Sequence, residues 1–338
     1  RRFGATAVCK PWEGIMRKIM YGLVALAAAI AAAWGFGPRV ETNTVTSFDP
    51  ASIGTDPDAY LAASEAKVSD VHDNLQKEII WAYPASKAKT PLAIIYIHGF
   101  SASKNETRPV PDMAAKALGA NLYLTRLTGH GIDGNALANA TVNDWAHDMA
   151  EALAVGKMIG EKVIVVGVST GAGLATWAAS DAALTNQIDG MVFISPNYGV
   201  QAGGAWLLTM PFGEQLANVI VGKERVFETH NDMHKRFWTW SYPTKALLPM
   251  AALTKLAAET VVENIRQPVL MIYSETDTVI RPDLVKSVAG RWGGNAELYA
   301  LPKNDDPSSH VIAGDALSPS TNKEVADKIV EWVKAQAF

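Results

Sequence analysis

The feature that most constrains the fold is an apolar, β-branched run that breaks at a glycine-rich turn, EKVIVVGVSTGAGLATW at residues 161–177. Residues 163–166 have the length and branching of a buried strand, and the segment after the turn has helical composition. Gly167 and Gly171 therefore mark a reversal from strand to helix. Ser169 lies between these glycines, and we expect it to adopt a strained backbone conformation that points its hydroxyl outward.

Strand-like and helix-like segments alternate through much of the remaining chain. The expected strands cover residues 79–83, 92–97, 121–127, 163–166, 190–194, 269–273 and 296–301. The expected helices cover residues 111–118, 141–158, 172–180, 281–289 and 322–335. Repeated strand–helix units predict an α/β fold with a mainly parallel sheet flanked by helices.

The alternation stops between residues 197 and 266, which are rich in Trp, Met, Phe and Leu and show no strand rhythm. We interpret this segment as a helical cap over an apolar pocket, although its apolar residues could simply pack the insertion's own core. The predicted organisation is then a lead-in at 41–90, a core at 91–196, the cap at 197–266 and the rest of the core at 267–338.

Residues 1–40 form an N-terminal extension with an export or anchor segment. Arg17 and Lys18 precede an uncharged Ala/Leu/Ile-rich run at 19–38, which could be a cleavable signal or a retained membrane helix of about 20 residues. The flanking charges favour this over a buried core helix and place the main domain outside the cytoplasm, periplasmic or anchored to the membrane. The first fifteen residues lack a starting Met and are set aside, and Cys9, the single cysteine, allows no intrachain disulfide.

Composition excludes several classes of protein. A net charge of −4 and a pI near 6.0 give no electrostatic basis for nucleic-acid binding.

Three short motifs suggest other functions but lack the context that those functions need. The GHGIDG run at 129–134 matches a dinucleotide-binding pattern, but we expect no helix to begin inside it. His230 and His234 are four residues apart, as two zinc ligands on a helix would be, but no third ligand is evident. Asn105-Glu106-Thr107 matches a glycosylation pattern, but we expect it to cap a turn. We expect neither a cofactor nor a metal.

A serine hydroxyl reacts as a nucleophile only when a base takes its proton and an acid orients that base. Asp277, after the predicted strand 269–273, and His310, after the predicted strand 296–301, are candidates for these partners of Ser169. Glu275, Asp305 and Asp306 are the alternative acids.

Several short runs together resemble one known family. They are His98-Gly99-Phe100, Gly129-His130-Gly131, Asp144-Trp145 with Asp148, the Ser169 turn, the run at Asp277 and Ser309-His310-Val311-Ile312. Over residues 91–338 the chain resembles the serine-hydrolase branch of the α/β-hydrolase fold, particularly bacterial carboxylesterases and monoacylglycerol lipases with a helical cap. Departures are Thr170, where many relatives have a larger apolar residue, and Ser274, where glycine is frequent.

The resemblance implies the order serine, acid, histidine, which Ser169, Asp277 and His310 follow. It also implies an oxyanion hole made by the backbone N–H groups of Phe100 and Thr170. The function it implies is hydrolysis of small to medium apolar acyl esters through an acyl-enzyme. Amide or thioester hydrolysis on the same residues, or a catalytically silent ligand-binding protein, are the alternatives.

Overall fold

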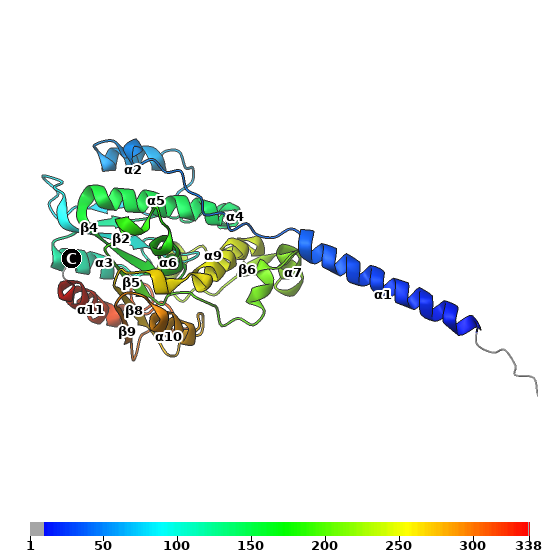
Figure 1. Ribbon diagram of the computed structural model, residues 1–338. Helices are drawn as coiled ribbons and strands as arrows, with labels where there is room; N and C mark the ends of the chain where they lie inside the picture. Colours follow the sequence, from blue (N-terminus) through cyan, green and yellow to red (C-terminus); the bar gives the residue numbers. More distant parts are fainter. Residues whose placement is uncertain (1–9, 337) are drawn as a thin grey trace, which may run out of the picture.

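A computed structural model describes residues 10–336 and 338 of the chain, and its centre is a seven-stranded sheet in the order β1-β3-β2-β4-β5-β8-β9 (Figure 1). Only β1 pairs antiparallel, with β3; the other pairs are parallel. The sheet strands are β1 (Glu78–Ile80), β2 (Thr90–Ile97), β3 (Asn121–Leu124), β4 (Gly160–Val168), β5 (Gly190–Ile194), β8 (Val269–Tyr273) and β9 (Ala296–Ala300). The α/β fold class with a mainly parallel sheet is confirmed.

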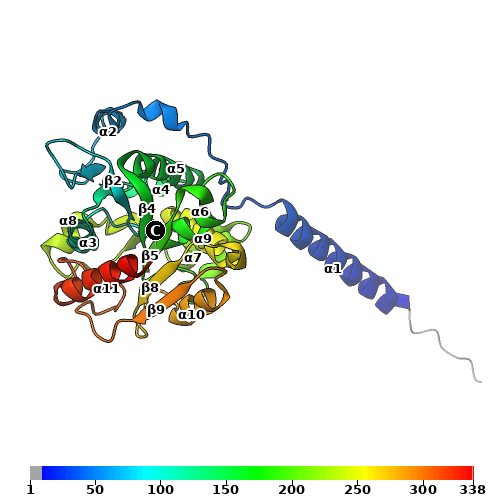
Figure 2. The ribbon, with the colours of Figure 1, turned by 60° about the vertical axis from the view of Figure 1, so that its left-hand side comes forward.

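Helices cover both faces of the sheet because its central strands are apolar on both sides (Figures 1 and 2). On β4, Val163 and Val165 pack into one core cluster and Ile164 and Val166 into the other. One cluster includes residues of α5 (Val142–Ile159), α6 (Thr170–Ser180), α9 (Leu247–Glu259) and α10 (Pro282–Arg291). The other includes residues of α3 (Val110–Leu118) and α11 (Asn322–Ala335).

Helix α1 (Lys10–Phe36) projects away from the rest of the molecule in both ribbon views (Figures 1 and 2). Its apolar stretch Gly14–Phe36 is 23 residues long and none of it is buried, which excludes a buried core helix. The helix begins at Lys10, so part of the segment set aside in the sequence analysis is helical after all. Cys9 lies outside the described residues.

The insertion at 197–266 is mainly helical, as expected, and it also contains a short two-stranded ribbon that the sequence did not indicate. It holds α7 (Gly213–Ile220), α8 (Asp232–Phe237) and α9, together with an antiparallel ribbon of β6 (Glu224–Val226) and β7 (Ser241–Pro243). Each strand has three residues, and those of β6 are all exposed, so no apolar alternation marks it. Helix α9 packs on α6 through the main core cluster.

Two shorter helices lie outside the sheet layers. Helix α2 (Pro57–Glu65) precedes the sheet, with the Asp56 carboxylate accepting a hydrogen bond from the N–H of Ala59. Helix α4 (Gly134–Asn139) begins at the last glycine of the GHGIDG run, with Asp133 as its N-cap. The expectation that no helix begins inside that run was therefore wrong, because a single well-placed aspartate starts a six-residue helix.

Candidate active site

Ser169 lies in a tight turn between the end of β4 and the start of α6. Its backbone has φ +49° and ψ −113°, which non-glycine residues rarely adopt. A Cβ on Gly167 would lie 2.8 Å from Cα of Ala172, and a Cβ on Gly171 would lie 2.4 Å from the carbonyl oxygen of Ile97. Both positions therefore need glycine for the strand to reverse into the helix.

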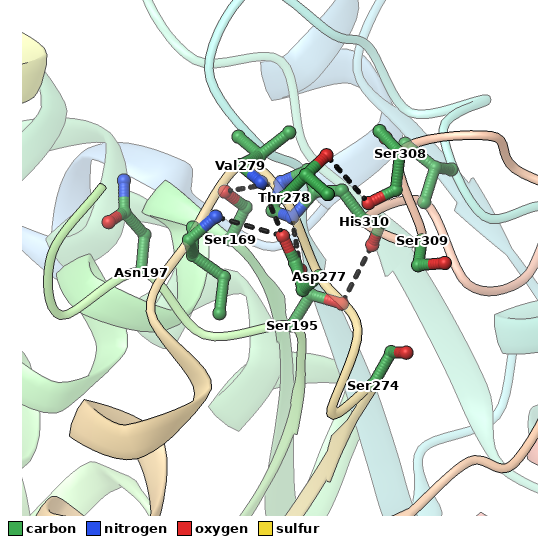
Figure 3. Close-up of polar contacts among 12 residues, drawn as sticks. Ser169, Ser195, Asn197, Ser274, Asp277, Thr278, Val279, Ser308, Ser309 and His310 are labelled. Atoms are coloured by element: carbon green, nitrogen blue, oxygen red, sulfur yellow. Dashed lines mark hydrogen bonds and ion pairs between the residues drawn. The ribbon is translucent and has the colours of Figure 1, made fainter. Parts of the chain in front are cut away.

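Asp277 and His310 reach Ser169 from the loops after β8 and β9 (Figure 3). The Oγ of Ser169 lies 3.1 Å from Nε2 of His310, and Nδ1 of His310 lies 2.8 Å from Oδ2 of Asp277. The other Asp277 oxygen accepts the backbone N–H groups of Val279 at 2.7 Å and Ile280 at 2.8 Å. The structure thus brings the three predicted residues into one hydrogen-bonded line, with the aspartate fixed at both oxygens.

The alternative acids are engaged elsewhere. The Glu275 carboxylate is exposed and binds the Lys286 ammonium at 2.9 Å. Asp305 accepts hydrogen bonds from the backbone and hydroxyl of Ser320. Asp306 accepts backbone N–H groups of the loop that carries the histidine. Of the four carboxylates considered, only Asp277 contacts the His310 ring in the described residues.

The electrostatic environment of His310 favours its protonated form. Burial alone would lower the pKa of the imidazole, but the hydrogen bond and charge of Asp277, with smaller contributions from Glu106 and Asp306, outweigh burial. The net pKa lies above the ordinary value of 6.5. An imidazole in this setting can take a proton from Ser169 and hold it as an imidazolium facing a carboxylate.

The two expected oxyanion donors have free N–H groups. Neither the amide of Phe100 nor that of Thr170 donates a hydrogen bond within the described residues. Thr170 is the first residue of α6, where a backbone N–H has no partner in the helix. These two amides are therefore available to a substrate carbonyl oxygen beside Ser169.

The peptide groups around the Phe100 amide are held by side chains. Nδ1 of His98 lies 2.9 Å from the carbonyl oxygen of Gly99, and the Gly99 N–H donates to Glu106. On the other side, the Ser101 N–H donates to Nε2 of His130 at 3.1 Å. Because C=O and N–H point in opposite directions in a trans peptide, holding the Gly99 carbonyl also sets the direction of the Phe100 N–H.

Both histidines act in this loop as neutral rings. Nε2 of His98 accepts the N–H of Leu127 at 3.1 Å, so Nδ1 carries the proton that His98 donates to Gly99. Burial lowers the pKa of His98 to about 4 and that of His130 well below its ordinary value. His98 therefore holds this loop against the residues that follow β3.

The Asp144, Trp145 and Asp148 run supports the turn that carries His130. Asp144 completes a capping box with Thr141 at the start of α5. From the same helix, Trp145 donates to the carbonyl oxygen of Thr128 at 3.0 Å, and Asp148 accepts the Thr128 N–H at 2.6 Å. These residues therefore position the loop rather than react.

Sequence reasoning did not predict the positions that three residues take around the site. The Ser195 hydroxyl donates to the carbonyl oxygen of His310 at 2.7 Å, and Asp306 accepts the N–H of His310 at 2.9 Å, so both fix the histidine's backbone. Glu106, considered only as part of a glycosylation pattern, accepts the N–H of Gly99 in the loop at residues 98–101, which carries the expected oxyanion donor Phe100 and is called the oxyanion loop below. Isolated polar residues in loops give no signal of such contacts: the partner of Ser195 lies 115 residues away, and those of Asp306 and Glu106, although 4 and 7 residues away, follow no repeating pattern.

Comparison with known proteins supports a common architecture. The chain is 28% identical over 208 residues to a thermostable monoacylglycerol lipase of Bacillus sp. (strain H-257), covering 60% of this chain and 76% of that protein. A structure from the pair of metagenome-derived lipolytic enzymes LipS and LipT superposes with a TM-score of 0.65 at 19% identity, covering 79% of this chain and all of that one, 100%. A soluble variant of monoglyceride lipase from Saccharomyces cerevisiae gives a TM-score of 0.56 at 15% identity, over 78% of this chain and 92% of that one.

A model of the alpha/beta hydrolase family matches residues 94–327, from the middle of β2 into α11. This range contains Ser169, Asp277 and His310 and spans more than half of the 338 residues. The chain therefore belongs to the alpha/beta hydrolase family.

Proposed function

We propose that this protein is a serine carboxylic-ester hydrolase that acts on small to medium apolar acyl esters. The observation that carries the proposal is the line from Ser169 Oγ through His310 to Asp277, together with the N–H groups of Phe100 and Thr170, which donate no hydrogen bond within the described residues. Similarity to the monoacylglycerol lipase of Bacillus sp. supports a lipase- or esterase-like activity.

In the proposed reaction, Ser169 Oγ attacks the ester carbonyl while His310 Nε2 takes the hydroxyl proton. The carbonyl oxygen becomes an oxyanion that the N–H groups of Phe100 and Thr170 bind. Asp277 stabilises the imidazolium, which then gives its proton to the departing alkoxide, so that an alcohol leaves and an acyl-serine remains. Water, deprotonated by His310, attacks the acyl-serine and releases the carboxylic acid, returning the proton to Ser169.

The same groups could cleave an amide or thioester, and a silent binding protein could retain them. A fluorophosphonate probe, which traps a reactive serine, should label Ser169, and p-nitrophenyl acyl esters of increasing chain length should be turned over. Tight binding of an ester analogue without labelling or turnover would instead indicate a ligand-binding protein.

The pH dependence of hydrolysis should follow the state of His310. Only the neutral imidazole can accept the Ser169 proton, and its pKa lies above 6.5 because Asp277 outweighs burial. We therefore expect kcat/KM to decrease as the pH falls, with the midpoint of the acid limb above 6.5. Initial rates with a p-nitrophenyl ester across pH 5–9, corrected for p-nitrophenol ionisation, measure this limb. A flat profile through neutrality would contradict the assignment of His310 as the base.

We also propose that α1 anchors the protein in a membrane with the hydrolase domain outside the cytoplasm. The 23-residue stretch Gly14–Phe36 has no buried residues, and as a helix it would be about 34 Å long, against about 30 Å of hydrocarbon. Where it ends, the Phe212 N–H donates to the Pro38 carbonyl oxygen at 2.8 Å. Trp206 and Ile220, on the same insertion as Phe212, are 63% and 64% exposed, as expected of side chains beside lipid headgroups.

Charges placed in α1 should release the protein from membranes. Leu26→Arg with Ile30→Arg puts two charges in the middle of the stretch, each costing about 2.5–3.5 kcal/mol on insertion. After expression in a bacterium and carbonate washing, the wild type should sediment with membranes and the double variant should lose most of this association. Val45→Arg, at an exposed position beyond the helix, is the matched control and should behave like the wild type. Sedimentation of the double variant with the membranes would contradict the proposal.

A further inference from the structure

Glu106 is a buried carboxyl group between the oxyanion loop and the histidine loop. Its residue is 3% exposed, and its Oε2 accepts the Gly99 N–H. On the other side, a Cβ on Gly314, which follows His310 on its loop, would lie 2.4 Å from the Glu106 carbonyl oxygen. The segment that carries Glu106 therefore packs against both of the loops that serve Ser169.

Basic residues flank Glu106 in sequence, but within the described part of the chain they do not pair with it. The two neighbouring basic residues turn to other carboxylates: Lys104 Nζ lies 2.7 Å from Glu78, and Arg108 Nη2 lies 2.6 Å from Asp112. No ion pair in the described part of the chain includes Glu106. A buried carboxyl without a counter-charge favours its neutral form, and burial accordingly raises the pKa of Glu106 to about 7, against the lowering effects of the Gly99 N–H and His310.

The absence of a side chain at residue 99 lets this carboxyl approach the nucleophile. A Cβ on Gly99 would lie 2.8 Å from Glu106 Oε1 and 3.3 Å from Cβ of Ser169. The Gly99 peptide thus separates the Glu106 carboxyl from the Ser169 side chain. The Gly99 N–H, held by Glu106, belongs to the His98–Gly99 peptide, and the Gly99 carbonyl, held by His98, belongs to the Gly99–Phe100 peptide. Glu106 and His98 therefore fix the peptides on the two sides of Gly99, and Glu106 acts on the Phe100 N–H through the backbone of Gly99.

Glu106 and the imidazole of His310 also shift each other's pKa. Its negative charge raises the pKa of His310, and the positive charge on His310 lowers the pKa of Glu106. The other titratable groups around this pair are Asp277 and Asp306, which act on His310, and Tyr96, whose pKa burial and the Glu106 charge raise. The contribution of Glu106 can be separated from that of Asp277, because only Glu106 also holds an amide of the oxyanion loop.

We propose that Glu106 is a positioning residue of the hydrolytic reaction, which aims the Phe100 N–H through Gly99 and, when ionised, stabilises the imidazolium of His310. This inference rests on the proposed function, since it assigns Glu106 a part in the same site. Glu106 would thus act on two parts of the site, because the same carboxyl orients the Phe100 N–H and raises the basicity of His310.

Two substitutions separate the two roles. Glu106→Gln keeps an oxygen that can accept the Gly99 N–H but removes the charge, so kcat on the alkaline plateau should stay within about threefold of the wild type. The acid limb of its kcat/KM profile should move to lower pH, because His310 loses a neighbouring negative charge. Glu106→Ala also removes the acceptor, and a misaimed Phe100 N–H should lower kcat by about 10- to 100-fold with little change in KM.

The experiment measures kcat and kcat/KM for a p-nitrophenyl ester from pH 5 to 9, with thermal unfolding of each full-length variant. Glu275→Gln is the control, because it removes an exposed carboxylate near Asp277 that binds Lys286 and should leave the acid limb in place. An unshifted acid limb in Glu106→Gln overturns the electrostatic role, and Glu106→Ala with wild-type kcat overturns the positioning role. If the alanine variant does not fold, the acid limb of the glutamine variant decides: a shift to lower pH supports the proposal, and an unshifted limb overturns it. Wild-type turnover that does not depend on Ser169 would instead refute the proposed function itself.

Discussion

Replacing Ser169 by alanine should lower kcat for ester hydrolysis by about 10⁶-fold. The hydroxyl is the only group of the proposed site that forms a covalent bond to the substrate, and alanine has no hydroxyl from which His310 could take a proton. The small residual rate would come from substrate binding and the two N–H groups. Steady-state hydrolysis of a p-nitrophenyl ester by purified full-length protein measures the loss, and fluorophosphonate labelling should disappear with it.

Ser180→Ala is a matched control for this experiment. Ser180 ends the same helix, and its hydroxyl donates only to the carbonyl oxygen of Trp177 within the described residues. This variant should keep wild-type activity and labelling. Comparable rates for the wild type and Ser169→Ala would refute serine hydrolysis, whereas equal losses in both variants would indicate a damaged helix.

Replacing Asp277 by asparagine should lower kcat by about 10⁴-fold. The Asp277 Oδ1 is fixed by the N–H groups of Val279 and Ile280, so an asparagine oxygen should remain there and its NH₂ group should face His310 Nδ1. Nδ1 would then have to accept a hydrogen bond, which places the imidazole proton on Nε2 and prevents it from taking the proton of Ser169. The kinetic measurement is kcat on a p-nitrophenyl ester at the alkaline plateau, where His310 is neutral.

Glu275→Gln provides the comparison for the aspartate. Glu275 lies on the same loop but turns outward to Lys286 and to the hydroxyl of Tyr273. Its loss should change kcat by less than about twofold, as is usual for an exposed carboxylate. A larger loss in Glu275→Gln than in Asp277→Asn would mean that the acid had been assigned to the wrong residue.

The sequence is most informative where one local pattern determines the structure. Strands β5 and β8 were predicted with their observed bounds, because a strand buried on both faces is a continuous apolar run. The geometry around Ser169 follows from Gly167 and Gly171, since any side chain there would strike backbone atoms. The resemblance then indicated Asp277 and His310, and the structure places His310 within hydrogen-bonding distance of both Asp277 and Ser169.

Structure determined by distant partners could not be predicted in this way. The ribbon of β6 and β7 has three residues in each strand, and β6 presents Glu224, Arg225 and Val226 to solvent, so no period is visible. Glu106 lies between Lys104 and Arg108 in sequence, and was considered there only as part of a run expected to cap a turn. Only the fold shows that both cations pair with other carboxylates and that Glu106 is buried.

The hydrogen bonds around the Phe100 amide would influence how the protein binds its substrate. The Gly99 carbonyl, the Gly99 N–H and the Ser101 N–H are already engaged before any ligand binds. The proposed oxyanion donor, the Phe100 N–H, would thus be preorganised, and no reorientation of dipoles would have to accompany the proposed chemical step. Binding energy from the acyl chain can then go toward orienting the ester rather than toward reshaping the protein.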